Sequence, residues 1–333
     1  MKHLFVFTLL FLISCGEPST VQTLQGDALG TTYSIKYFLD DGEIQTQQID
    51  SLLNVINTSM STYIQHSDIS KINSGDTTIV VDDHFKQVFE TSKKIYKDTD
   101  GYFDPSVGLL VNAYGFGPEG YSEEVSDQEI DSLHQYVGFH NIQLRPDRIV
   151  TSNSDILYLD FNAIAKGYTV DVFADYLKSK GSQNFLVEIG GEVVVFGENL
   201  DNNRPWKVGI EMPLEDGSRE LKYGVNLNNE ALATSGNYRK YRVDPDTGFK
   251  YVHTINPKTG RSQKSDILSA SVIANTCAEA DAYATAFMAM GLQKAKEFLT
   301  SGTGLKVIFI YSDENGNQKS FTSKDLKDSI DEF

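Results

Sequence analysis

The chain has 333 residues, 40% of them hydrophobic, which is enough for one large domain or two ordinary ones with a sizeable core. Its formal net charge is −17, and a surface this acidic repels phosphate backbones, so we expect no nucleic-acid partner. Any phosphate-bearing ligand must therefore be held by local features such as a metal ion, a helix end or a few cations.

The N-terminus is predicted to be a targeting segment. Residues 1–3 are followed by an apolar run at 4–13, which is too short to cross a bilayer and has the length of a signal-peptide core. Leu12-Ile13-Ser14-Cys15 resembles a bacterial lipobox; the alternative is an ordinary secretory signal with a chance cysteine. We therefore expect a signal peptide over 1–14 and lipidation of Cys15. The protein would then be an exported lipoprotein anchored to a bacterial cell membrane on its periplasmic side.

The mature chain is predicted to have three parts. Residues 15–25 are a polar tether expected to be poorly ordered, residues 26–325 form the main domain, and 326–333 are an acidic tail expected to fray. Strand hairpins mixed with helices within 26–325 indicate the α+β class, as a single intertwined domain of mostly antiparallel sheet packed with helices.

Hydrophobic periodicity predicts the elements of the domain. Helices are expected over 49–60, 67–73, 82–98, 126–137, 163–181, 278–291 and 292–301. Strands are expected over 29–38, 77–81, 142–144, 148–151, 184–189, 192–196, 206–212, 221–226, 231–235, 239–243, 250–255, 270–274, 305–311 and 318–322. The strands at 221–226 and 231–235 are expected to pair with each other.

The stretch 159–181 carries the first candidate site. We interpret it as a short apolar strand ending at Asp160, a turn, and a helix that opens at about Ala163 with Asn162 as its N-cap. Small residues surround Lys166 in the first turn, so a phosphate can approach the free N–H groups of the helix end. The alternative is an ordinary strand-to-helix connection with a solvated lysine.

A second candidate site lies on the predicted helix 278–291. Asp281 and Thr285 are four residues apart and share a helix face. Carboxylate and hydroxyl oxygens are suitable ligands for Mg²⁺, which keeps open positions for phosphate oxygens. The alternative is an aspartate that caps the helix and a threonine bonded back to its own helix.

Three further segments carry weaker signals. His253 leads into the turn Pro257-Lys258-Thr259-Gly260 and can be a base, a donor or a structural histidine. The hydroxyls beside a glycine in 233–238 suit a phosphate or a ribose, and equally an ordinary turn. The loop 101–105 offers backbone groups ahead of a proline, and its alternative is a plain X-Pro turn.

Taken in order, these motifs resemble those of the ApbE family, the FAD:protein FMN transferases. The matching runs are LGTTY at 29–33, STY at 61–63, GYFDPS at 101–106, DFNAIAKG at 160–167, IGGE at 189–192, TSGNY at 234–238, HTINPKTG at 253–260 and AD…T at 280–285. They span about residues 28 to 291. The resemblance implies an ApbE-like fold for residues 26–325, and the lipoprotein signal also suits the family.

The resemblance also implies a ligand arrangement, with FAD between the start of the central helix, the loop at 102–104 and the segment 253–260. The implied FAD-binding residues are Leu29, Tyr63, Tyr102, Phe103, Asp104, Asp160, Lys166 and Ile255. The implied Mg²⁺ ligands are the Ala163 carbonyl, the Asp281 carboxylate and the Thr285 hydroxyl. Leu29 departs from the methionine that the family often has there. Ala284 replaces an aspartate that some relatives have just before the threonine, so that ligand is missing.

The implied reaction transfers FMN from FAD to a threonine or serine hydroxyl of a target protein and releases AMP, with Mg²⁺ neutralising charge on the pyrophosphate. His253 is the implied base, and Asp281 acts through the metal. The expected acceptor is a flavoprotein subunit of a membrane redox complex. One alternative is an Mg²⁺-dependent FAD pyrophosphatase that gives FMN and AMP. Another is a flavin-binding lipoprotein without turnover, against which the joint presence of Asp281 and Thr285 argues.

Overall fold

The structure is a computed structural model that describes residues 20–118, 125–214, 218–236, 241–243, 250–262, 265–326 and 329–333. Its framework is an eight-stranded sheet in the order β1-β2-β5-β6-β10-β15-β16-β17, and each neighbouring pair is antiparallel. The strands are β1 (Gln22–Ala28), β2 (Thr31–Phe38), β5 (Asn184–Ile189), β6 (Glu192–Phe196), β10 (Ala231–Gly236), β15 (Ile267–Ala274), β16 (Lys306–Ser312) and β17 (Gln318–Thr322). The predicted α+β class is confirmed.

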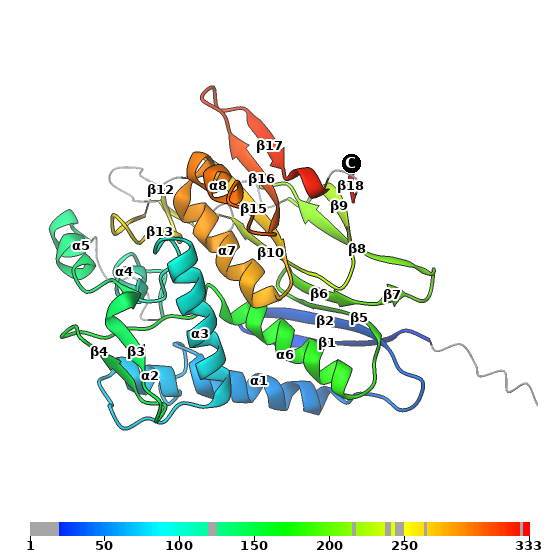
Figure 1. Cartoon of the computed structure of the whole chain (residues 1–333), viewed down its shortest axis with the longest axis horizontal. Coiled ribbons are helices and arrows are strands. Elements are labelled where there is room, and N and C mark those ends of the chain that lie inside the picture. The colour runs from blue at the N-terminus through cyan, green and yellow to red at the C-terminus, as the bar shows by residue number, and fades with distance from the viewer. Residues whose placement is uncertain are drawn as a thin grey trace, which may run out of the picture.

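A second sheet, ordered β18-β9-β8-β7, lies beside the first (Figure 1). It comprises β7 (Glu198–Asn199), β8 (Arg204–Glu211), β9 (Leu221–Leu227) and β18 (Ile330–Glu332). Three two-stranded pairs complete the strands: β3 (Ile142–Leu144) with β4 (Val150–Ser152), β11 (Tyr241–Val243) with β12 (Lys250–Val252), and β13 (Ile255–Asn256) with β14 (Arg261–Ser262). The described parts of the predicted hairpin at 239–255 confirm it, and its turn lies outside the described residues.

The helices are α1 (Thr46–Met60), α2 (Asp68–Asn73), α3 (Asp83–Asp98), α4 (Gly108–Ala113), α5 (Asp127–His134), α6 (Ala165–Ser179), α7 (Cys277–Met290) and α8 (Leu292–Leu299), with 3₁₀ turns at Phe139–Asn141 and Lys324–Leu326. Four of them begin at a side-chain cap, supplied by Ser67, Asp82, Ser126 and Thr276. Among the helices described, none has both the length and the apolar character needed to cross a bilayer.

The large sheet is buried on both faces in its centre. Helices α6 and α7 cover one face (Figure 1), where Val194 packs with Val170 and Phe173 of α6. On the opposite face, Val193 and Val195 pack against the second sheet. Because side chains alternate along a strand, burial on both faces explains why β6 has consecutive valines.

Both ends of the domain are more ordered than the sequence suggests. Residues 22–25 of the predicted tether belong to β1, which pairs with β2 from Gln22↔Tyr37 to Ala28↔Thr31. At the other end, part of the predicted frayed tail forms β18, which covers the edge of β9. Its acidic residues are paired with lysines of the neighbouring strands: Asp331 with Lys207, and Glu332 with Lys222. These cross-strand ion pairs explain why an acidic tail stays ordered.

Several strand predictions are wrong. Strands β9 and β10 were expected to pair, but β9 pairs with β8 and β18, whereas β10 lies between β6 and β15. Neighbouring strands often form hairpins, but here the short connection carries the chain from one sheet to the other. The predicted strand 77–81 forms only the isolated bridge Val80↔Ile149.

The position that most constrains the helical layer is Gly167, in the first turn of α6. A Cβ atom placed on Gly167 would overlap the backbone carbonyl of Cys277, the first residue of α7. The two helix starts therefore touch backbone to backbone, and only glycine permits this distance.

We expect Gly167→Ala to lower the free energy of unfolding by about 1–3 kcal/mol, because the added methyl group must displace a backbone carbonyl instead of a mobile side chain. Denaturant titration followed by circular dichroism measures this change. Asp175→Ala, at an exposed position of the same helix, is the matched control and should change stability by less than about 0.5 kcal/mol. Equal stability of Gly167→Ala and wild type would show that α7 moves aside without cost.

Candidate functional site

The opening of α6 differs from its prediction. The helix begins at Ala165, two residues later than expected, and the N-cap position is Ile164 without a side-chain cap. Asn162 is not the cap; its backbone N–H donates to the Asp160 carboxylate at 2.8 Å. The segment before Asp160 is extended but forms no strand, since its Asp160 N–H donates to the Pro105 carbonyl at 2.8 Å. This irregular entry leaves the first turn of α6 open.

The Asp281 carboxylate fills a place in that open turn. The Gly167 N–H donates to Asp281 Oδ2 at 3.0 Å, and Asp281 is only 4% exposed. In a regular α-helix this N–H would bond to the carbonyl four residues earlier, that of Ala163. No backbone N–H of the described residues bonds to the Ala163 carbonyl. Asp281, which is far from Ala163 in sequence, thus takes the place that the Ala163 carbonyl would have in a regular helix.

Asp281 is therefore not a cap of its own helix. The N-cap of α7 is Thr276, whose hydroxyl accepts from the Glu279 N–H, and Asp281 lies in the second turn. One turn later, Thr285 Oγ1 lies 3.2 Å from Ser235 Oγ of β10. The two residues thus face α6 and the sheet, and the capping alternative is excluded.

Lys166 lies near two acidic side chains, Glu192 and Asp281. Its ammonium is 2.5 Å from Glu192 Oε1, and Asp281 is also close enough to act on it. Burial disfavours the Lys166 ammonium, but Glu192 and Asp281 outweigh burial and raise the pKa of Lys166. Burial also raises the pKa of Asp281, against the attraction of Lys166. The cluster holds one cation and two carboxyl groups, so it is short of positive charge.

Glu192 ends the motif IGGE at 189–192, and the sequence did not assign it a role in the site. It is 2% exposed, burial raises its pKa to about 7, and its Oε2 has no hydrogen-bond partner within the described structure. The turn Gly190-Gly191, with φ angles of 59° and 105°, joins β5 to β6 and aims Glu192 at Lys166. An acidic residue directly before a run of three valines was the signal available in the sequence.

Leu29, Tyr63 and Asp160 are three further residues of the implied FAD site. Leu29 is at the tip of the β1–β2 hairpin with a φ of 51°, in a two-residue turn with Gly30. Tyr63 is 62% exposed, and its pKa is raised by burial of its hydroxyl and by the charge of Asp160. An exposed aromatic ring beside a carboxylate leaves a ring face open to a planar ligand.

The loop 101–106 is held rigidly from within. Asp104 is 7% exposed and accepts hydrogen bonds from the Ser106 N–H, the Ser106 hydroxyl and the Phe139 N–H. Phe103 is 2% exposed and belongs to the core. The side chains of Phe103 and Asp104 thus point inward and fix the loop. At these two residues, only the backbone is left to contact a ligand.

Tyr102 is the outward-facing residue of that loop. Its ring lies beneath two ammonium groups, with Lys294 at 5.1 Å and Lys258 at 5.7 Å from the ring centre, and Lys294 donates to its hydroxyl at 2.7 Å. Lys258 comes from the segment 253–260 and also pairs with Asp100 at 3.2 Å. The loop 101–106 and the segment 253–260 therefore meet at Tyr102, as the sequence interpretation requires.

The segment 253–260 is built into a small hydrophobic cluster. Ile255 is 5% exposed and packs with Leu110, Tyr114 and Ile130. His253 is half-buried, with its ring 6.4 Å from that of Phe116. Asn256, whose amide donates to the Ala289 carbonyl at 3.4 Å, ties the segment to the end of α7. The Ile255 side chain is committed to packing, whereas His253 keeps an accessible edge.

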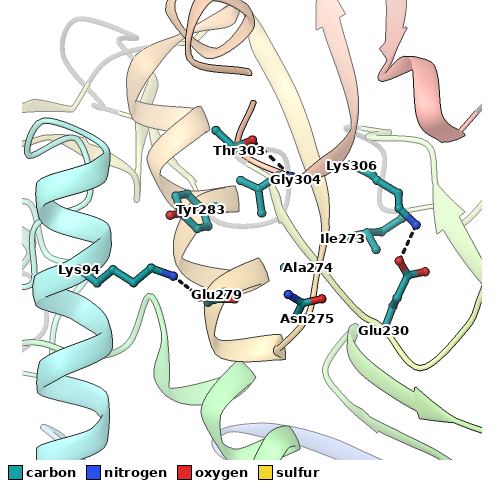
Figure 2. Close-up of a pocket in the computed structure, with 11 residues that line it drawn as sticks. Lys94, Glu230, Ile273, Ala274, Asn275, Glu279, Tyr283, Thr303, Gly304 and Lys306 are labelled. Carbon is teal, nitrogen blue, oxygen red and sulfur yellow. Dashed lines mark hydrogen bonds and ion pairs between the residues drawn. The ribbon is translucent and has the colours of Figure 1, made fainter. Parts of the chain in front are cut away.

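Two cavities of 170 and 290 Å³ lie elsewhere. Both are lined by Glu279, which pairs with Lys94 of α3 at 2.5 Å; Figure 2 shows this pair at the smaller cavity. Residues 279 and 283 line the smaller cavity from one face of α7, and 281 and 285 point from the other, since two residues correspond to about 200° of helix. These cavities are thus separate from the candidate site.

The candidate site is suited to a magnesium ion by the chemistry of its oxygens. Asp281, Thr285 and the Ala163 carbonyl offer hard oxygen ligands, and Glu192 Oε2 has no hydrogen-bond partner among the described residues. Across the described residues, no group of three or more His, Cys, Asp or Glu side chains is arranged to hold a metal, and the expected ligand set contains only one such side chain.

Known proteins resemble this chain in sequence and in fold. The sequence model of the ApbE family matches residues 29–309. A protein named FAD:protein FMN transferase from Vibrio cholerae is 35% identical, with 96% of each chain covered, and one of the same name from Escherichia coli K12 is 30% identical, covering 96% of this chain and 94% of its own. The solved structure of the flavin transferase ApbE from Vibrio cholerae matches with a TM-score of 0.83 at 32% identity, covering 94% of this chain and 100% of its own. The apo flavinyl transferase ApbE of Pseudomonas stutzeri gives 0.81 at 28% identity, covering 93% and 97%. The chain belongs to the ApbE family.

Proposed function

We propose that the chain transfers FMN from FAD to a hydroxyl of a target protein and that it does so with Mg²⁺ at Asp281. The observation that carries the metal part is the Gly167 N–H, which donates to Asp281 and leaves the Ala163 carbonyl without a helical partner. When bound there, Mg²⁺ neutralises charge on the pyrophosphate as the phosphoryl group transfers. Family membership and the names of the relatives support the flavin part.

In the reaction, a bond forms between the target hydroxyl oxygen and the FMN-side phosphorus of FAD. The bond from that phosphorus to the bridging oxygen breaks, and AMP leaves with the electron pair. The chain binds FAD between Tyr63, Tyr102 and the start of α6, and Lys166 contributes a cation near the pyrophosphate. The hydroxyl proton goes to a base, for which His253 is our candidate because its ring is half-buried beside the segment that meets Tyr102.

The lipid anchor and the acceptor are also part of this proposal. Cys15 lies outside the described residues, and β1 begins at Gln22, so only residues 16–21 separate the two. Six extended residues span about 20 Å. A domain held so near the bilayer meets mainly acceptors at the membrane surface, in agreement with a flavoprotein subunit of a membrane redox complex.

We expect Asp281→Ala to abolish flavin transfer while FAD still binds, because the carboxylate is the only formally charged side chain of the proposed ligand set. Thr285→Val should impair transfer less, and Asp281→Asn should regain partial activity at high Mg²⁺. AMP release and flavinylation of an acceptor, measured against Mg²⁺ concentration, test this. Wild-type activity that persists in excess EDTA would remove the metal from the mechanism. AMP release without an acceptor adduct by mass spectrometry would favour the FAD pyrophosphatase.

Because Lys166 pairs with Glu192, its effect on the free energy of unfolding and its effect on FAD affinity can be measured separately. Lys166→Met should lower the free energy of unfolding by about 1–3 kcal/mol, since it leaves a buried carboxyl group unpaired. The double variant Lys166→Met/Glu192→Gln should recover most of that loss but keep a weakened affinity for FAD. Unfolding and FAD titration of both variants measure the two effects. Recovery of FAD affinity along with stability would show that Lys166 only neutralises Glu192.

The anchor predicts a change of location without a change of fold. Cys15→Ser should move the protein from the membrane fraction to the soluble fraction, with an unchanged unfolding transition, because residue 15 precedes β1. Fractionation and immunoblotting detect the shift, and Ser14→Ala is the control that keeps the cysteine. A Cys15→Ser protein that stays in the membrane fraction would contradict lipidation.

A further inference from the structure

Asp171 is a carboxylate of α6 that the reaction described above does not use. It lies four residues after Gly167, one turn further along the same face of the helix. It is partly buried and lines the larger cavity.

Both oxygens of Asp171 bind the start of α7. The Cys277 N–H donates to Oδ1 at 2.8 Å, and the Ala278 N–H donates to Oδ2 at 2.9 Å. These two N–H groups are in the first helical turn and have no partner within their own helix. A carboxylate at a helix N-terminus is also favoured by the helix dipole. Asp171 thus anchors α7 by its first two residues.

The hydrogen bonds of Asp171 run in the opposite direction to the one at the candidate site: here α7 donates and α6 accepts. At one end, Gly167 of α6 gives its N–H to Asp281 of α7; one turn away, Asp171 of α6 receives N–H groups from α7. The backbones touch between these contacts, at Gly167 and Cys277. The two helices therefore cannot slide or rotate against each other without breaking both contacts, so the position of Asp281 depends on Asp171.

We propose that Asp171 is a positioning residue for flavin transfer: it fixes the start of α7 on α6 and so holds the Asp281 carboxylate at the Gly167 N–H. This inference rests on the proposed role of Asp281 in binding Mg²⁺. Burial raises the pKa of Asp171 to about 7, against the two backbone N–H groups that favour its ionised form. A carboxylate is thus kept at residue 171 although its burial is unfavourable. Its two oxygens each accept from one of the two adjacent N–H groups.

The test compares Asp171→Asn with wild type. Asparagine has the same shape but only one acceptor oxygen, and its amide would face a backbone N–H. We expect the Mg²⁺ concentration for half-maximal flavin transfer to rise about 10- to 100-fold, as for residues that orient metal ligands, with kcat lowered. Calorimetric titration with Mg²⁺ alone should show the same loss of affinity, whereas FAD affinity measured in EDTA should be unchanged.

Two controls separate positioning from general stability. Asp175→Asn changes the next turn of α6, where the side chain is 78% exposed, and should leave the Mg²⁺ dependence unchanged. Lys94→Ala removes the exposed ion pair to Glu279 at the start of α7 and should also leave it unchanged. All assays are made well below the unfolding temperature of each variant.

The outcomes are distinct. An Asp171→Asn protein that is less stable but keeps the wild-type Mg²⁺ dependence would overturn the inference and leave Asp171 a structural residue. Wild-type protein indifferent to Mg²⁺ would overturn the proposed metal and the inference together, which the wild-type titration alone reveals. If Asp171→Asn does not fold, Asp171→Glu carries the test. It keeps both acceptors but displaces α7 by one methylene, so it too should need more Mg²⁺, and a wild-type response would refute the proposal.

Discussion

The close approach of the starts of α6 and α7 is the constraint on which the candidate site depends. Gly167 lets the two backbones touch, and the Gly167 N–H turns away from its own helix to Asp281. That single exchange leaves the Ala163 carbonyl without a backbone partner among the described residues, and it brings a buried carboxylate to the start of α6. An irregular helix start that would otherwise leave polar groups unpaired is thereby turned into a set of oxygen atoms suited to a cation.

The electrostatics of the cluster follow from the same contact. Lys166, the residue before Gly167, pairs with Glu192 and is also influenced by the charge of Asp281. Because burial penalises both carboxyl groups, one lysine does not balance them, and the pKa of Glu192 rises to about 7. A divalent cation would supply the missing positive charge. The acidic character of the whole chain makes such local compensation necessary for an anionic ligand such as FAD.

The surrounding segments reach the site as tight turns on a rigid sheet. The hairpin tips at Leu29-Gly30 and Gly190-Gly191 have positive φ angles, and the loop 101–106 is fixed by the buried Asp104. Such turns hold backbone groups in fixed positions, while some of their side chains pack in the hydrophobic core. This division explains why Phe103, Asp104 and Ile255 are buried although the family resemblance lists them with the ligand.

The sequence by itself determined the α+β class, nearly all helices, most strands and the order of the family motifs, because periodicity, caps and turn residues act over a few neighbours. It also pointed to Lys166, Asp281 and Thr285 as candidate site residues, and their roles stay predictions. Only the tertiary structure decided that β9 and β10 belong to different sheets and that Glu192 and Asp171 serve the same pair of helices. Pairings between residues about 25 to 115 positions apart depend on how whole elements pack, and no local pattern encodes which N–H will meet which carboxylate.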